Sequence, residues 1–377
     1  MAITRITTAN AIADSSVQNI KMSNIVQSKN IIINGDMSLA QRATSASSLT
    51  SSGYHTVDRY QTSITNIGTW TQSQSTTVPT GQGFATSLKM DCTTADASPA
   101  ADDALLIKQK IEGQNLQYLK KGTSSAESLT LSFWVRSNKT GTYITRLQDA
   151  DNSRNISQSY TISSADTWEK KTLTFAGDTT GAFNNDNGSS LELNFWLGAG
   201  STYTSGTLNT SWNSITDANI AVGQVNLADS TSNEWYVTGV QLEAGTTASE
   251  FEFLPFNVNL QRCQRYYYKV IAEANGRPLT SLGYCYNSTA GIVMVPFSTI
   301  MRISPTALEQ NGTASDYSIL NNVAGAATCS AVPTFDQGMT WGARITFTVA
   351  SGLNAGQGIQ GRASNTNAYL AWSAELW

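Results

Sequence analysis

Few residues in this chain could carry acid–base chemistry. His55 is the only histidine among the 377 residues, and Asp58 follows it three positions later. A His–Asp pair can begin a hydrolytic triad, but the sequence has no G-x-S-x-G nucleophile motif, and the pair lies in a strand-like segment. We therefore interpret His55 and Asp58 as structural residues.

Paired carboxylates would be the alternative route to catalysis, because a glycosidase needs two of them on either side of a sugar bond. The pairs in the sequence are Asp102/Asp103, Asp149/Asp151 and Glu250/Glu252. Adjacent residues of a strand point to opposite faces, which places Asp102 and Asp103 poorly. Glu250 and Glu252 share a face, and we interpret them as solvated edge charges. No enzyme is expected.

Metal binding is the next chemistry to consider. Two oxygen-rich segments, DADN at 149–152 and NNDN at 184–187, offer ligands of the kind that Ca²⁺ takes, so Asp149, Asp151 and Asp186 are candidate calcium ligands. Neither segment matches an EF-hand, and turn formation alone accounts for Asn and Asp there. The four cysteines lack CxxC spacing, which argues against a zinc site; they are either free thiols or include a Cys285–Cys329 bridge. We expect no metal and no cofactor.

Tryptophan and tyrosine side chains could instead bind sugars or a protein receptor. Trp134 and Trp196 lie on the faces of their strands opposite the main apolar positions. They therefore form a second buried face, a contact between subunits or a platform for a sugar ring. Near the glycine-rich segment at 352–361, Trp341, Tyr369 and Trp372 are the expected receptor contacts.

The elements that must position these residues are β-strands. Short segments of alternating apolar and polar residues, separated by Gly, Ser, Asn and Asp, predict an all-β fold with a jelly-roll-like β-sandwich body over residues 30–258. The predicted strands Ser128–Val135 and Leu191–Leu197 each place their apolar residues on one face. Ile220–Asn226 is also a predicted strand. Residues 259–377 are predicted to form a short neck and a smaller β-sandwich tip domain.

Composition limits the partners. Only 13% of the residues are charged, against roughly 25% in average globular proteins, and the net charge is −4. The sequence has no basic cluster for nucleic acid and no apolar run for membrane insertion, and no secretory signal is expected. Residues 1–29 form an irregular segment in which scattered apolar residues are predicted to dock on partner chains: Ile3, Ile6, Ile12, Val17, Ile20 and Ile25.

Three stretches of the sequence share motifs with one protein family. They are NIIINGDMSLAQR at 30–42 with YHTVDRY at 54–60, the run GVQLEAG, SEFEFLPF and LQRCQRYYYK within 239–269, and PFSTIMRISPT at 296–306 with the final AWSAELW. From about Asn30 onward the chain resembles bacteriophage virion proteins, chiefly tail-fibre-like ones. It departs from their pattern at Ser249-Glu250, where they have Thr-Pro, and at Leu254, where they have Arg.

The resemblance implies a virion structural protein that is assembled in the host cytoplasm. A tail fibre or similar receptor-binding appendage of this kind is usually a homotrimer. Its N-terminus would dock on other virion proteins, and its C-terminal β-domain would contact a host cell-surface glycan or protein. The alternatives are a capsid decoration or head fibre protein, and a polysaccharide depolymerase or carbohydrate-binding module.

Overall fold

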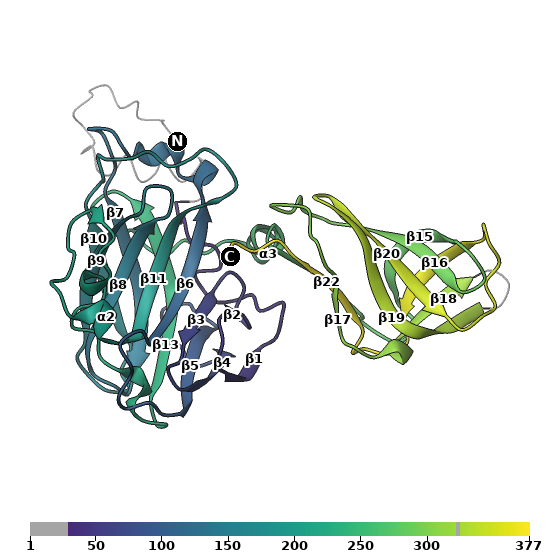
Figure 1. Ribbon diagram of the computed structural model, residues 1–377, viewed down its shortest axis with the longest axis horizontal. Helices are drawn as coiled ribbons and strands as arrows, with labels where there is room; N and C mark the ends of the chain where they lie inside the picture. Colours follow the sequence, from purple (N-terminus) through teal and green to yellow (C-terminus); the bar gives the residue numbers. More distant parts are fainter. Residues whose placement is uncertain (1–28, 322–324) are drawn as a thin grey trace, which may run out of the picture.

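The computed structural model describes residues 29–321 and 325–377, which are almost entirely β. The chain forms a larger body and a smaller tip that lie side by side along the long axis of the molecule (Figure 1). The predicted N-terminal docking residues, from Ile3 to Ile25, lie outside the described residues. Within the described ranges no helix is long and apolar enough to cross a membrane.

Two antiparallel sheets make up the body. One has the strand order β1 (Ser45–Leu49), β4 (Thr69–Ser75), β5 (Ser87–Thr94), β13 (Glu234–Ala244), β7 (Leu129–Ser137) and β10 (Glu169–Phe175). The other has the order β12 (Asn213–Ser214), β9 (Arg154–Ile162), β8 (Gly141–Asp149), β11 (Ser189–Ala199), β6 (Ala104–Glu112), β3 (Gln61–Thr65) and β2 (Gly53–Tyr54). Because the chain crosses repeatedly from one sheet to the other, the predicted jelly-roll-like sandwich is confirmed.

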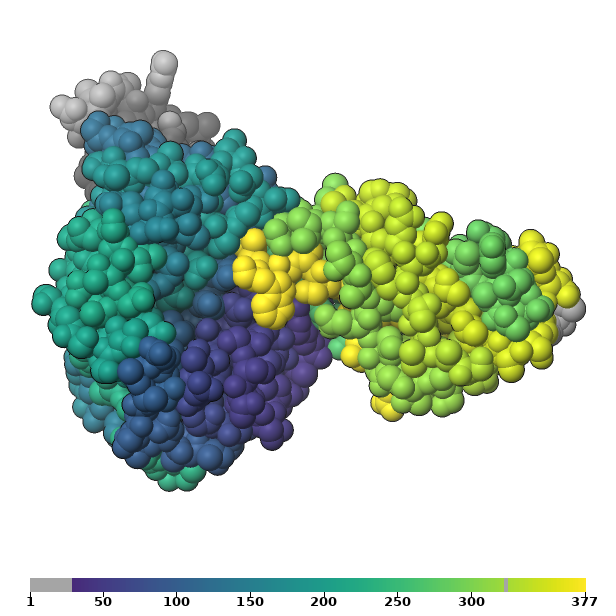
Figure 2. Space-filling model, in the orientation of Figure 1, coloured from purple at the N-terminus to yellow at the C-terminus, as the bar shows by residue number. Residues whose placement is uncertain are grey.

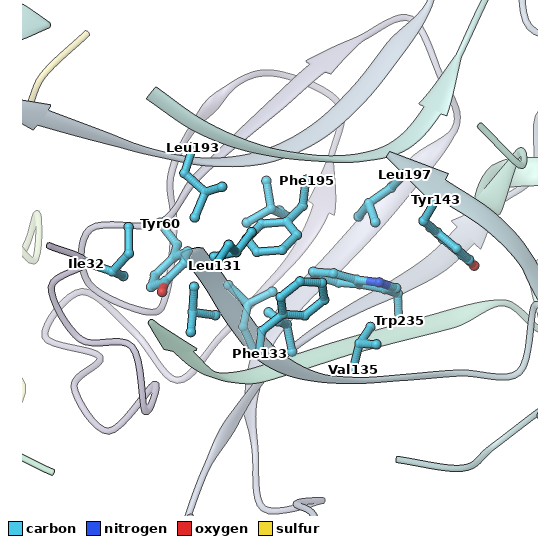
Figure 3. Close-up of a cluster of buried hydrophobic side chains, with 14 of the residues drawn as sticks. Ile32, Tyr60, Leu131, Phe133, Val135, Tyr143, Leu193, Phe195, Leu197 and Trp235 are labelled. Atoms are coloured by element: carbon cyan, nitrogen blue, oxygen red, sulfur yellow. The ribbon is translucent and has the colours of Figure 1, made fainter. Parts of the chain in front are cut away.

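The core of the body lies between the two sheets. Leu193, Phe195 and Leu197 of β11 face the apolar side chains of β7 (Figure 3). Phe195 meets Phe133 edge to face, with 5.1 Å between the ring centroids. Each such side chain contributes about 1.5–3 kcal/mol when it is fully buried. Strand alternation then sends the intervening residues of β11 to the opposite side of the seven-stranded sheet.

The connections of the body contain only short helical turns: η1 (Gly113–Asn115), η2 (Gln117–Leu119), α2 (Ser201–Thr204), η3 (Asp217–Asn219) and η4 (Leu227–Asp229). The prediction of a strand at Ile220–Asn226 is wrong. Ile220 and Ala221 instead lie in a loop, and their side chains pack on the outer face of the seven-stranded sheet. The segment has the apolar residues of a strand because Ile220 and Ala221 pack against the sheet, but it pairs with no neighbouring strand.

The neck is α3 (Phe256–Gln264), which begins after Pro255. The tip contains a three-stranded sheet of β14 (Tyr267–Ile271), β22 (Tyr369–Ser373) and β17 (Glu309–Gln310), and one further turn, η5 (Ala314–Asp316). Its other six strands form a closed barrel in the order β15 (Pro278–Cys285), β16 (Ala290–Pro296), β20 (Gly342–Val349), β19 (Gly325–Met339), β18 (Tyr317–Asn321) and β21 (Gly358–Ala363). The tip is all-β as predicted, but these strands close on themselves rather than forming an open sandwich.

The last residues of the chain return to the body. In Figure 2 they are the yellow atoms at the junction of body and tip. The buried carboxylate of Glu375 pairs with the buried guanidinium of Arg59 and lies 3.2 Å from Arg42 Nη1. Tyr54 donates a hydrogen bond to the Leu376 carbonyl at 2.6 Å. The tip is therefore fastened to the body through charges that are removed from water.

A second ion pair joins neck and body. Arg265 at the end of α3 donates two hydrogen bonds of 2.7 Å to the carboxylate of Glu112 at the end of β6. The hydroxyl of Tyr266 also donates to Glu112. Burial alone would raise the pKa of Glu112, but these donors outweigh it and lower the pKa below its usual value. The carboxylate is thus held ionised against α3.

We expect Glu375→Gln to destabilise the protein by about 3–5 kcal/mol, because removing one partner leaves the guanidinium of Arg59 buried without its counter-ion. Urea unfolding followed by tryptophan fluorescence measures the change. The matched control is Glu250→Gln, since Glu250 is exposed. Equal unfolding midpoints for Glu375→Gln and Glu250→Gln would show that the ion pair does not support the junction.

Candidate functional site

The structure supports a structural role for His55 and Asp58. The buried carboxylate of Asp58 accepts hydrogen bonds from the Gln41 backbone N–H at 2.9 Å and from Gln41 Nε2 at 2.6 Å. Burial raises the pKa of Asp58 to about 6, although these two hydrogen bonds oppose the rise. The Nε2 atom of His55 is buried with no hydrogen-bond partner in the described chain. Gln41, not His55, holds the Asp58 carboxylate.

The three calcium candidates do not converge on one position. Asp149 lies 2.5 Å from Lys121 Nζ, Asp151 accepts the backbone N–H of Asn184 at 2.9 Å, and Asp186 accepts that of Gly188 at 2.8 Å. Among the described residues no group of three or more Asp, Glu, His or Cys side chains could hold a metal ion. Each carboxylate instead stabilises a turn or pairs with lysine. Cys285 and Cys329 are both free thiols.

The expected receptor contacts of the tip do not share one surface. Trp372 is fully buried, at 0% exposure, and its ring lies 5.2 Å from that of Phe297. The prediction that Trp372 contacts a receptor is therefore wrong, because β22 turns this side chain into the core of the tip. Tyr369 is half-buried under the Lys269 ammonium, 4.4 Å from its ring centroid. Trp341 is 54% exposed and stays available.

A groove of about 380 Å³ lies on the outer face of the seven-stranded sheet of the body. Its floor is formed by strands β3, β6, β8 and β11, and one wall is formed by the loop that carries α2 and η3. We call it the sheet groove. Its lining residues are Ser63, Thr65, Ala104, Leu106, Lys108, Arg146, Gln148, Glu192, Asn194, Trp196, Tyr203, Ile215, Asp217 and Ile220.

Strand alternation explains why polar residues line the floor. Since Leu193 and Phe195 point into the core, Glu192, Asn194 and Trp196 must point into the groove. The register then sets their neighbours. Asn194 lies opposite Arg146 on β8 and opposite Lys108 on β6, and Glu192 lies opposite Gln148 and Lys110 in the same way.

One end of the groove is apolar. Trp196 packs with Leu106, Ile144 and Ile220 in a second small core outside the sheet, and its ring lies 5.3 Å from that of Tyr203. Of the roles left open for Trp196, the structure therefore supports the second buried face. The loop that contains Ile220 and Ala221 covers the Trp196 side chain.

Three N–H groups of the groove are buried with no hydrogen-bond partner in the described structure: Arg146 Nε, Asn194 Nδ2 and Trp196 Nε1. The residues are only 8%, 1% and 2% exposed. Burial lowers the pKa of Arg146 to about 10, against the opposing effect of Glu192 and Asp217. Buried donors are nearly always paired in folded proteins, so three together leave the floor of the groove short of hydrogen-bond acceptors.

A larger cavity, of about 560 Å³, lies near the neck but lacks this property. Gln109, which lines it, donates to the Ile33 carbonyl at 2.9 Å and accepts the Ile33 N–H at 2.8 Å. Arg265 is held by Glu112, as described above. The sheet groove is therefore the better candidate site.

Only one residue of the groove was a candidate from the sequence alone. Trp196 stands out because it lies opposite the apolar face of its strand. Lys108 and Arg146 look like ordinary surface cations of alternating strands, and only the register of β6, β8 and β11 brings them together. Sequence reasoning therefore missed both of them.

No protein-family model matches the sequence, and no curated protein matches it either. Solved structures with some likeness include the enzymatically active domain of tailspike protein 4 of bacteriophage CBA120, at 16% identity and a TM-score of 0.30 over 57% of this chain. This chain spans only 21% of that protein. A family 11 carbohydrate-binding module of a Clostridium thermocellum cellulase gives 11% identity and 0.26 over 58% of this chain and 96% of the module. A xylan-binding domain from Paenibacillus barcinonensis is 11% identical, with a TM-score of 0.22 over 50% of this chain and 87% of that domain.

We expect Asn194→Leu to leave the stability unchanged or to raise it by about 1 kcal/mol, because an unpaired buried amide is a cost that leucine lacks. Asn233→Leu is the matched control and should destabilise, since Asn233 Nδ2 donates to the Leu227 carbonyl at 2.9 Å. Thermal unfolding of both variants measures the difference. A loss of stability in Asn194→Leu as large as in Asn233→Leu would mean that Asn194 is fully paired in the protein.

Proposed function

We propose that the chain is a non-enzymatic structural protein of a phage virion, a tail fibre or similar appendage, whose body holds a host-surface glycan in the sheet groove. The motifs at 30–42, 239–269 and 296–306 support the virion assignment by resemblance. The observation that carries the binding assignment is the set of unpaired N–H donors on Arg146, Asn194 and Trp196.

The groove has the properties of a saccharide site. Its volume of about 380 Å³ lies within the range of small-molecule sites. Sugars present hydroxyl oxygens beside patches of C–H, so they need hydrogen-bond donors next to an apolar wall. The groove provides donors from Arg146 and Asn194, and an apolar wall from Leu106, Trp196 and Ile220.

The appendage model also gives roles to the two ends of the chain. The N-terminal segment would dock on other virion proteins of the tail or, in the head fibre alternative, of the capsid. Trp341 would be a further contact with the host surface. Leu282 and Tyr284 on β15 and Tyr286 just after its end are exposed, which suits a contact between subunits of a homotrimer. Three copies of a weak groove would add avidity.

Glycoside hydrolysis is a second candidate function, because Glu192 and Asp217 both line the groove. A glycosidase needs two carboxylates on either side of the scissile bond. Glu192, however, lies 3.5 Å from the Lys110 ammonium. The Glu192 carboxylate is therefore already engaged by a lysine of its own chain, which supports binding as the main role. Release of reducing ends that both Glu192→Gln and Asp217→Asn abolish would favour hydrolysis.

We expect Thr65→Trp to weaken binding to bacterial surface oligosaccharides by about tenfold or more, because a bulky ring at the exposed rim obstructs the groove. Thr93→Trp, at an exposed position of β5 on the other sheet, is the matched control. A glycan array read with both variants and the unmodified protein measures the effect. Unchanged binding by Thr65→Trp would move the site away from the groove.

We expect light scattering to give three times the chain mass of 40.4 kDa if the appendage is a homotrimer. The same measurement on a chain that lacks residues 1–29 shows whether the N-terminal segment or the β-domains hold the subunits together. If the subunits meet through β15, Tyr284→Ser should lower the mass in both forms. A monomer in every form would contradict the trimer and favour the decoration-protein or binding-module alternatives.

A further inference from the structure

We propose that the ligand of the sheet groove is an acidic saccharide, and that its carboxylate or equivalent oxyanion binds to Arg146, Asn194 and Lys108. This inference rests on the proposed function, because it names the class of glycan that the same groove takes. It begins with the register of three neighbouring strands.

Arg146, Asn194 and Lys108 form one row across the floor of the groove. Asn194 of β11 pairs directly with Arg146 of β8 on one side and with Lys108 of β6 on the other. Directly opposed residues of antiparallel strands have their Cβ atoms about 4.5–5.5 Å apart. All three side chains line the groove. An ion placed above Asn194 would therefore meet donors from both flanking strands.

The row contains donors and no ionised acceptor. Arg146 Nε and Asn194 Nδ2 are buried with no partner in the described structure, and neither Arg146 nor Lys108 takes part in an ion pair among the described residues. Guanidinium and ammonium groups can only donate. A carboxylate, which only accepts, is the complementary group. A charge-assisted hydrogen bond is also roughly twice as strong as one to a neutral hydroxyl.

The acids that face the row do not neutralise it. Glu192 lies in the neighbouring row, where it faces Lys110 at 3.5 Å, and Asp217 stands on the wall at η3. Counting Lys108, Lys110 and Arg146 against Glu192 and Asp217 leaves three positive charges and two negative ones, a net charge of +1. Burial is also the largest cause of the lowered pKa of both Lys108 and Arg146. A bound anion would offset this cost.

Other buried or half-buried arginines of the body and neck show what Arg146 lacks. Arg59 pairs with Glu375, Arg154 lies 2.7 Å from Asp178, and Arg265 is bidentate on Glu112. Each therefore has a carboxylate from its own chain. Arg146 is 8% exposed, against 1% for Arg59, and a guanidinium so far from solvent needs a counter-ion. No carboxylate of the described chain forms an ion pair with Arg146, so that role is left to the ligand.

The test is a glycan array of matched pairs that differ only in charge. One pair is oligogalacturonide and its neutral methyl ester, and a second is a carrageenan-derived oligosaccharide, whose only charges are sulfates, and its neutral desulfated form. We expect the protein to retain an acidic member at least about tenfold more tightly than its neutral partner. Arg146→Met should remove this preference, and Asn194→Leu should weaken it. Arg136→Met is the matched control, since Arg136 lies on β7 of the other sheet and pairs with Asp166. Thermal unfolding confirms that each variant is folded.

The two pairs separate a carboxylate ligand from a sulfate ligand, and the other outcomes are decisive. The acidic-ligand inference would be overturned if the neutral members bound as well as the acidic ones and Arg146→Met left their binding unchanged. If Thr65→Trp still abolished that binding, the groove would remain a glycan site. An acidic preference that survives in Arg146→Met would place the anion elsewhere and overturn it as well. If no member of either pair binds, this inference fails, whereas the proposed function fails only if the bacterial surface oligosaccharides do not bind either.

Discussion

The pairing of Arg59 with Glu375 is the constraint on which the two-part shape of the molecule depends. These residues lie 316 positions apart in the chain, and both are removed from water. The guanidinium also lies 3.5 Å from the ring centroid of Tyr266, and its Nη2 donates to the Lys110 carbonyl at 2.6 Å. A buried charge is tolerated only with such a set of partners. Separating the tip from the body would therefore leave the Arg59 guanidinium without its counter-ion.

The same contacts reach the sheet groove through β6. The backbone of Lys110 accepts from Arg59, and its side chain extends to Glu192 on the other side of the sheet. Glu192 is thereby held by Lys110 in the row next to Arg146. If the Glu192 carboxylate formed an ion pair with Arg146 instead of Lys110, the positive charge of Arg146 would already be neutralised within the protein.

Much of the fold could be predicted from the sequence, because alternation of apolar residues is a local property. Leu129–Val135 and Leu191–Leu197 form strands with the predicted faces toward the core. Closure of the tip barrel could not be predicted, since it depends on β21 pairing with both β15 and β18 across long loops. The error at Trp372 has the same origin. An aromatic residue near the chain end looks exposed until the tip is known to pack around it.

The site was harder to predict, and the reason is physical. A lysine and an arginine on separate strands look like solvated charges, because a strand does not specify which strands will flank it. Only after β11 lies between β6 and β8 do Lys108 and Arg146 stand on either side of Asn194. The loop that packs on Trp196 then shields part of this row from water. A polar sheet surface becomes a candidate site here because a loop covers one side of it and the row of Lys108, Asn194 and Arg146 contains no ionised acceptor.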